Sequence, residues 1–151
     1  MHRTIICDTS CFIVLTNIGN LDLLQKVYGQ IFTTPEVASE YGENLPDWIV
    51  IEQAVNIQMQ QLLELQLDKG ESSAIALALG TPECTVILDD IKARKIAERL
   101  GLEITGTIGV IIKAKLIGII PSIKPLIEKI KATNFRLTTD IETQALVAAK
   151  E

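Results

Sequence analysis

The chain has 151 residues, of which 48% are hydrophobic and only 4% aromatic, and its formal net charge is −5 at pH 7. This composition excludes a disordered chain, because aliphatic side chains are abundant enough to fill a core, and the length predicts a single domain over residues 1–151. Charged residues interrupt the apolar stretches and the start of the chain has no basic, apolar leader. We therefore expect a cytoplasmic protein without a membrane span or a membrane partner.

The negative net charge at first argues against nucleic-acid binding, because proteins that bind phosphate groups are usually basic. Acidic residues predominate in residues 1–75, whereas bases slightly exceed acids in residues 76–151. This uneven distribution allows a basic surface beside an acidic one, although ordinary solvated helix faces give the same pattern.

Cysteine usage indicates a reduced protein. Cys7, Cys11 and Cys84 are odd in number and lack paired spacing, and the single histidine, His2, offers them no partner for zinc. We expect reduced thiols that are buried as small apolar groups.

Strand and helix patterns alternate along the first half of the chain. The run TIIC, residues 4–7, predicts a strand that is buried on both faces and ends at Asp8. Ser10 is expected to cap a helix that Gly19 closes, and Asn20 to cap a second helix before Gly29. The other elements expected here are a strand at 30–34, a helix at 35–41 capped by Thr34, a strand at 48–51 and a helix at 55–66.

The second half continues the alternation. GESSAIALALG, residues 70–80, predicts a helix bounded by glycines, and TVIL, residues 85–88, predicts a strand. Asp89 or Asp90 is expected to cap a helix at 91–101, which is followed by a strand at 102–105 and by helices at 107–118 and 122–132. Strands that alternate with helices predict an α/β fold with a mostly parallel central sheet.

Carboxylates are expected to meet at one edge of this sheet. Asp8 and the pair Asp89 and Asp90 follow strands, and ligands of open parallel sheets bind beyond the carboxyl ends of the strands. Glu40 lies three residues after Val37, and Glu71 lies three, four and seven residues before apolar positions of its own helix, so both are predicted on inward faces. Unpaired carboxylates are costly in such places, so another group must compensate for their charge.

A hard divalent cation would provide that compensation. Ligation by oxygen alone, without histidine or cysteine, favours Mg²⁺ or Mn²⁺ over zinc. Such a site suits hydrolysis of phosphodiester bonds, because the metal activates water and stabilises the leaving oxygen. The acids that follow the strands are thus interpreted as metal ligands.

Five segments in order carry a family resemblance: IICDTSCFIVL, TTPEVASEY, GESSAIALA, VILDDIKARKIAERLGL and GTIGVIIKAKLIGIIPSIKPLI. Over about residues 3–137 the chain resembles the PIN-domain family of metallonucleases, most closely a prokaryotic subgroup with GE-x-x-A-I-A-L and D-D-x-x-A-R motifs. The resemblance implies a three-layer α/β/α sandwich and a Mg²⁺- or Mn²⁺-dependent endoribonuclease that cleaves single-stranded RNA. Because many prokaryotic members are toxins of toxin–antitoxin pairs, it also implies a small antitoxin protein as a partner. The isoleucine-rich segment 108–120 is expected in the core or in a homodimer surface.

The resemblance assigns roles by position. Asp8 corresponds to the first acid of the family, Ser10 to the hydroxyl residue that assists it, and Glu40 to the helical glutamate. Glu71 stands where many relatives have aspartate, so contact with the metal through water is an alternative to direct ligation. Leu88 replaces the usual threonine two residues before the last aspartate, which leaves open whether Asp89 or Asp90 faces the metal. The expected catalytic residues are Asp8, Glu40, Glu71 and Asp90, and the expected metal ligands are these four and Asp89.

Substrate contacts are expected from the segment that follows. Lys92 and Arg94, with Lys95 and Arg99, could hold RNA phosphates, although such a run is also typical of a solvated helix face. Thr107 follows the last strand and is expected to bond either the substrate or a carboxylate.

Three alternatives to these assignments stay open. The aspartates could act only as helix caps, and Glu36 competes with Glu40 for the inward position. The chain could be a non-catalytic PIN module that binds nucleic acid or protein with a vestigial acid cluster. A phosphoacceptor receiver domain would have an acid pair after its first strand and a single aspartate later, which is the reverse of the order in this chain.

Overall fold

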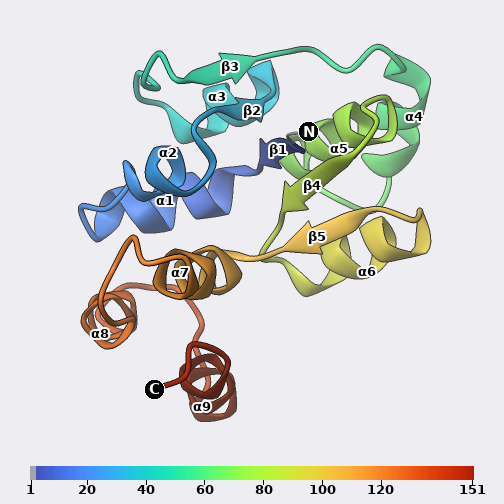
Figure 1. Ribbon diagram of the computed structural model, residues 1–151. Helices are drawn as coiled ribbons and strands as arrows, with labels where there is room; N and C mark the ends of the chain where they lie inside the picture. The colour runs from blue at the N-terminus through green and yellow to red at the C-terminus, as the bar shows by residue number, and fades with distance from the viewer. Residues whose placement is uncertain (1–2) are drawn as a thin grey trace.

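Five strands form one parallel sheet in the computed structural model, which describes residues 3–151 (Figure 1). They are β1 (Thr4–Cys7), β2 (Ile31–Thr33), β3 (Ile49–Ile51), β4 (Cys84–Ile87) and β5 (Glu103–Thr105). Their order across the sheet is β3-β2-β1-β4-β5, and every pair of neighbours is parallel. The strand order therefore reverses between β1 and β4, where ligands of such sheets bind.

The strands alternate with helices. The helices are α1 (Thr9–Asn17), α2 (Leu23–Tyr28), α3 (Pro35–Tyr41), α4 (Ile57–Leu63), α5 (Lys69–Leu79), α6 (Ile91–Arg99), α7 (Thr107–Leu116), α8 (Lys124–Lys131) and α9 (Thr139–Ala148). No helix among residues 3–151 has the length and apolar character needed to cross a membrane.

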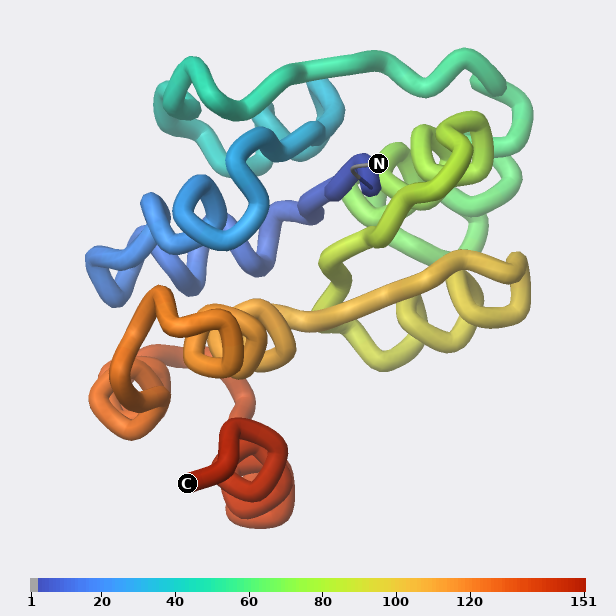
Figure 2. Tube along the Cα trace, viewed as in Figure 1, coloured from blue at the N-terminus to red at the C-terminus, as the bar shows by residue number. Residues whose placement is uncertain are grey.

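Helices cover both faces of the sheet. Successive strand residues point to opposite sides, so each strand contributes to the core on either face. Ile5 and Cys7 of β1 pack into a core with α1, α2 and α7, whereas Ile6 packs into a second core with α5 and α6. Helices α8 and α9 lie outside α7, away from the sheet (Figure 2). The result is the three-layer α/β/α sandwich that was expected, with a sheet that is entirely parallel rather than mostly so.

Helix α3 bridges the two sides of the sandwich. Val37 is fully buried in the core that α1 lines, and α3 also packs on α5. The helix begins as predicted, because Thr34 Oγ1 accepts a hydrogen bond from the backbone N–H of Val37. One side chain of α3 can therefore reach both α1 and α5.

The helix starts show two errors in the predictions. Helix α1 begins at Thr9 after Asp8, so Ser10 lies inside the helix and is not its cap. Helix α2 begins after Asp22, two residues beyond the predicted cap Asn20. Each predicted residue type suits a cap, but the residue at the N-cap position is an aspartate two residues away.

Two further differences concern β4 and the C-terminal region. Strand β4 covers Cys84–Ile87, so the fully buried Leu88 follows the strand instead of ending it. Helix α9 was not predicted. It packs on α7 through the buried Ala145, and Lys115 of α7 donates a hydrogen bond of 2.8 Å to the carbonyl oxygen of Ala149.

Candidate active site

Asp8 lies at the carboxyl end of β1, beside the place where the strand order reverses. Its side chain is almost fully buried, with 4% of the residue surface exposed, and its Oδ1 atom has no hydrogen-bond partner. Burial raises the pKa of Asp8 to about 8; the backbone N–H of Thr9 opposes the rise, and the charges of Glu71, Asp68 and Glu40 add to it. Asp8 is thus an inward-facing carboxyl group whose charged form has too little compensation.

Glu40 joins three helices at the same edge of the sheet. Its Oε1 accepts a hydrogen bond of 2.8 Å from the backbone N–H of Gly70 in α5, and its Oε2 accepts one of 2.9 Å from the hydroxyl of Thr9 in α1. Glu40 is exposed rather than buried on the inward face that was predicted, but its carboxylate turns toward α1 and α5. The competitor Glu36 instead accepts a hydrogen bond of 2.5 Å from Gln60 of α4.

Gly70 leaves the space that the Glu40 carboxylate occupies. A Cβ atom at Gly70 would lie 2.6 Å from Oε1 of Glu40, which is shorter than any ordinary contact. Glycine at this position therefore allows the carboxylate to approach the backbone of α5 closely.

If the site has the nuclease activity that the family resemblance implies, the variant Gly70→Ala is expected to lower it by about tenfold to a hundredfold, because the added methyl group must displace the Glu40 carboxylate. Its free energy of unfolding in urea should change little. Alanine favours the helix by roughly 1 kcal/mol relative to glycine, and this gain offsets the cost of displacing the Glu40 carboxylate. Gly80→Ala is the control, because a Cβ there would meet only the Leu77 carbonyl oxygen at 3.7 Å. Full activity in Gly70→Ala would show that the position of Glu40 does not matter.

Glu71 and Asp68 form a capping box at the start of α5. Asp68 Oδ1 accepts a hydrogen bond of 2.8 Å from the backbone N–H of Glu71, and Glu71 Oε1 accepts a longer one of 3.4 Å from that of Asp68. Burial raises the pKa of Glu71 to about 7, and the charges of Asp68, Asp90 and Glu40 contribute. Asp68 thus belongs to the same acidic group as Asp8, Glu40 and Glu71. The D-x-x-E spacing before an apolar run could have revealed it.

Asp89 is held by hydroxyl groups from two other elements. Its Oδ2 accepts hydrogen bonds from the hydroxyls of Thr107, at 2.6 Å, and Ser10, at 2.9 Å, while its Oδ1 accepts the backbone N–H of Thr107 at 2.7 Å. Of the two partners predicted for Thr107, the structure thus shows the carboxylate. These bonds tie the end of β4 to α1 and α7.

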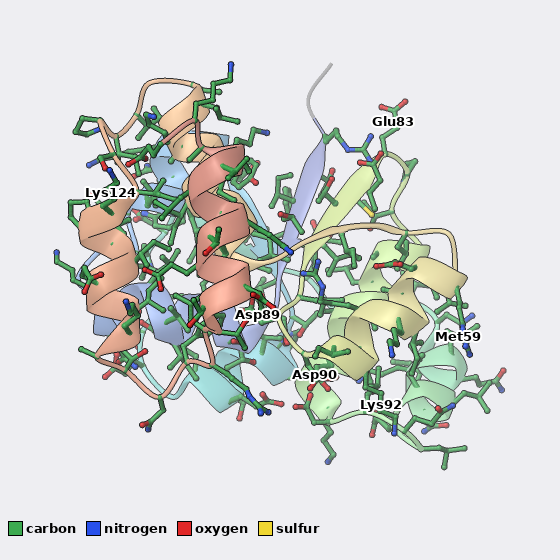
Figure 3. The ribbon with its side chains drawn as sticks, turned by 90° about the horizontal axis from the view of Figure 1, so that it is seen from below. Met59, Glu83, Asp89, Asp90, Lys92 and Lys124 are labelled. Atoms are coloured by element: carbon green, nitrogen blue, oxygen red, sulfur yellow. The ribbon has the colours of Figure 1, made fainter. Side chains whose placement is uncertain are left out.

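Asp90 has a different environment from its neighbour. Its Oδ2 accepts a hydrogen bond of 3.0 Å from the backbone N–H of Ala93, so Asp90 caps α6. In Figure 3, Asp89 lies between the two groups of helices and Asp90 lies at the start of α6. The charge of Asp90 contributes to the raised pKa of Glu71, so the two acids lie near each other.

The predicted basic residues divide into two kinds. Lys92, Lys95 and Arg99 are exposed on α6, and Lys92 lies close to Asp90 at the start of the helix (Figure 3). Arg94 is half-buried, and its Nη1 donates a hydrogen bond of 2.8 Å to the carbonyl oxygen of Leu88. Arg94 therefore points back toward the end of β4.

Two buried thiols flank Asp8. Cys7 precedes it in β1, and Cys11 lies one turn into α1; both are free and at most 1% exposed. Burial raises the pKa of Cys7 well above its usual range, and Cys11 and the acids Asp8 and Asp89 act in the same direction. Cys84 is also free and buried, as predicted, whereas His2 lies outside the described residues.

The acids at this edge of the sheet suit a hard divalent cation, because their ligand atoms are carboxylate oxygens. Within residues 3–151, no three acidic, cysteine or histidine side chains stand close enough together to chelate an ion as they lie. Mg²⁺ usually takes one or two protein carboxylates and keeps several waters, so it does not need a compact chelating group. The buried, unpartnered Oδ1 of Asp8 is the atom that such an ion would satisfy. The residues present therefore fit a divalent cation.

Comparison with known proteins assigns the chain to a family. A family model described as a PIN domain matches residues 4–151, which is almost the whole chain. No curated protein and no solved structure gave a significant match. PIN domains are generally nucleases, which are hydrolases, and they typically use divalent metal ions. With this match and its parallel α/β/α sandwich, the chain belongs to the PIN-domain family.

Proposed function

We propose that the protein is a Mg²⁺- or Mn²⁺-dependent endoribonuclease that hydrolyses phosphodiester bonds of single-stranded RNA. The observation that carries the proposal is the Asp8 carboxyl group, which is buried, has an unpartnered oxygen and lies among other acids. A group of this kind destabilises the fold unless a cation compensates for it. Asp8 lies at the strand-order reversal, where ligands of open parallel sheets bind.

Each acid has a distinct part in the proposed reaction. Asp8 binds the metal through its free oxygen. Gly70 and Thr9 fix the Glu40 carboxylate, which adds a second negative charge near the metal. Glu71, at the start of α5, holds the metal directly or through water. When bound, the metal supplies an activated water and stabilises the leaving oxygen.

Asp90 and Asp89 have separate roles in this proposal. Asp90 lies near Glu71 and is the preferred fourth acid, and Asp89 ties the end of β4 to α1 and α7 through Ser10 and Thr107. The exposed Lys92 lies beside Asp90, where it can contact a phosphate of the RNA.

Cleavage of a mixed RNA pool, analysed by sequencing the new ends, tests the proposal. Defined ends are expected in Mn²⁺ and none in EDTA, and Asp8→Asn should lose cleavage while it keeps RNA binding. If no RNA is cleaved although calorimetry shows bound Mn²⁺, the protein is instead a non-catalytic PIN module. In that case Asp8→Asn would leave every activity unchanged.

The proposal extends to biological context through the resemblance described above. The nuclease would be the toxin of a toxin–antitoxin pair, held inactive by a small protein partner, and would act as a homodimer. Growth arrest on expression of the wild-type chain, but not of Asp8→Asn, would support the toxin role, and sedimentation would report the oligomeric state.

A further inference from the structure

We infer that Arg94 is a positioning residue, which holds the Asp89 loop in place for the nuclease site and does not bind RNA. The inference rests on the proposed function for its catalytic consequence, but its structural core is a network of backbone contacts. That network joins residues 88–90, which follow β4, to residues 105–107, where the neighbouring strand β5 passes into α7.

The first contact fixes the backbone immediately before Asp89. Nη1 of Arg94 donates a hydrogen bond of 2.8 Å to the carbonyl oxygen of Leu88. Leu88 is fully buried, and its own N–H donates to the carbonyl oxygen of Thr105 at 2.8 Å. Both polar groups of the Leu88 backbone are therefore satisfied, which fixes the direction in which the chain enters Asp89.

The second contact concerns the neighbouring loop. A Cβ atom at Gly106 would lie 2.8 Å from Nη1 of Arg94 and 3.0 Å from Oδ1 of Asp89. The guanidinium and the carboxylate thus occupy the space that a side chain at position 106 would need. Glycine lets both groups approach the loop just before Thr107, whose N–H and hydroxyl bind Asp89.

Arginine suits this task better than lysine. Its planar guanidinium presents several donors in a fixed arrangement, whereas a lysine ammonium is a single, flexible point charge. Arg94 is also half-buried, unlike the exposed Lys92, Lys95 and Arg99 on the same helix. A contact whose main purpose was a phosphate of the substrate would favour the exposed side chains.

The structural part of the inference is tested on the metal-free protein without RNA. In Arg94→Gln, the Thr107 amide is expected to exchange with D₂O at least about tenfold faster than in the wild type, because the backbone that leads into its acceptor Asp89 loses the hydrogen bond at Leu88. The Ile6 and Val86 amides, in the centre of the sheet, report global unfolding and should be unchanged. Lys129→Gln, which removes an exposed charge from α8, is the charge-matched control. Unchanged exchange at Thr107 would overturn the inference.

The catalytic part is tested by separating turnover from binding. Arg94→Gln is expected to lower kcat by about tenfold to a hundredfold, as for other residues that orient a metal ligand, and to leave RNA affinity in EDTA unchanged. Arg94→Lys should not restore kcat, because charge alone does not replace the guanidinium. Weaker RNA binding with a smaller salt dependence, or full rescue by lysine, would instead indicate a phosphate contact and would overturn the inference.

The two proposals can fail separately. If the wild-type protein cleaves no RNA but Arg94→Gln accelerates exchange at Thr107, the nuclease proposal fails and the positioning of the loop stands. If cleavage is normal in Arg94→Gln, the nuclease proposal stands and the positioning role fails.

Discussion

Replacing Asp8 by asparagine is expected to lower RNA cleavage by about a hundredfold or more and also to stabilise the metal-free protein at about pH 8. The activity falls because the amide cannot supply the charged oxygen that a metal requires. The stability rises because the folded chain no longer has to bury a carboxylate whose pKa is raised to about 8. Stability and activity are thus expected to change in opposite directions.

The stability effect has a definite pH dependence. A carboxyl group with a raised folded-state pKa costs nothing below its unfolded value of 3.8, and its cost grows as the pH rises through the window up to about 8. The gain in stability of Asp8→Asn should therefore be absent near pH 4. At about pH 8 it should be on the order of 1 to 3 kcal/mol. The gain is limited because the buried amide of asparagine is itself a polar group with unsatisfied hydrogen bonds. At roughly 2 to 4 °C per kcal/mol, thermal melts in EDTA resolve this change.

A matched control separates burial from the loss of one negative charge. Glu43→Gln also removes one acid from a net negative chain, but Glu43 is exposed after α3. It should change neither the cleavage rate nor the pH dependence of stability. If Asp8→Asn is destabilised at about pH 8 to the same extent as near pH 4, the charged form of Asp8 is not the source of the cost.

Mg²⁺ binding is expected to become tighter as the pH rises from about 6 to 8 and to level off above that range. The metal requires ionised carboxylates, whereas the pKa of Asp8 is about 8 and that of Glu71 about 7, so binding displaces protons from both. The affinity should rise by roughly tenfold per pH unit for each proton displaced. Titration calorimetry in two buffers with different ionisation enthalpies measures both the affinity and the number of protons released.

The same titration with Asp8→Asn tests the assignment. This variant should bind Mg²⁺ more weakly and release about one proton fewer at neutral pH, because only Glu71 then remains to be ionised. An affinity that does not vary with pH in the wild type would mean that the metal binds away from these two acids.

Much of the fold could be predicted from local patterns. Apolar runs located the strands β1 and β4, and the Thr34–Pro35 pair marked the start of α3 correctly. Helix α9 was missed because its apolar side is small, with Ala145 as its buried residue, and its position depends on contacts with α7 that only the folded chain brings together. The N-caps of α1 and α2 are Asp8 and Asp22 instead of Ser10 and Asn20, because several neighbouring residues in each segment are types that favour a cap.

The candidate site was predictable in composition but not in its detailed contacts. Helical spacing predicted inward faces for Glu40 and Glu71. Glu71 is half-buried and Glu40 is exposed, and the charges of both contribute to the raised pKa of Asp8. The different roles of Asp89 and Asp90 could not be predicted, because adjacent residues of the same type differ only in the hydrogen-bond partners that the fold brings to them. Those partners, Ser10 and Thr107, lie 79 and 18 residues away from Asp89.

The burial of Cys7 and Cys11 on either side of Asp8 gives the protein an internal reporter of motion. A thiol that is buried away from solvent reacts with alkylating reagents only when the surrounding structure opens locally. Cys84, at the start of β4, reports in the same way from the opposite end of the sheet. The alkylation rates of the three thiols thus compare how often each end of the sheet opens, without any added label.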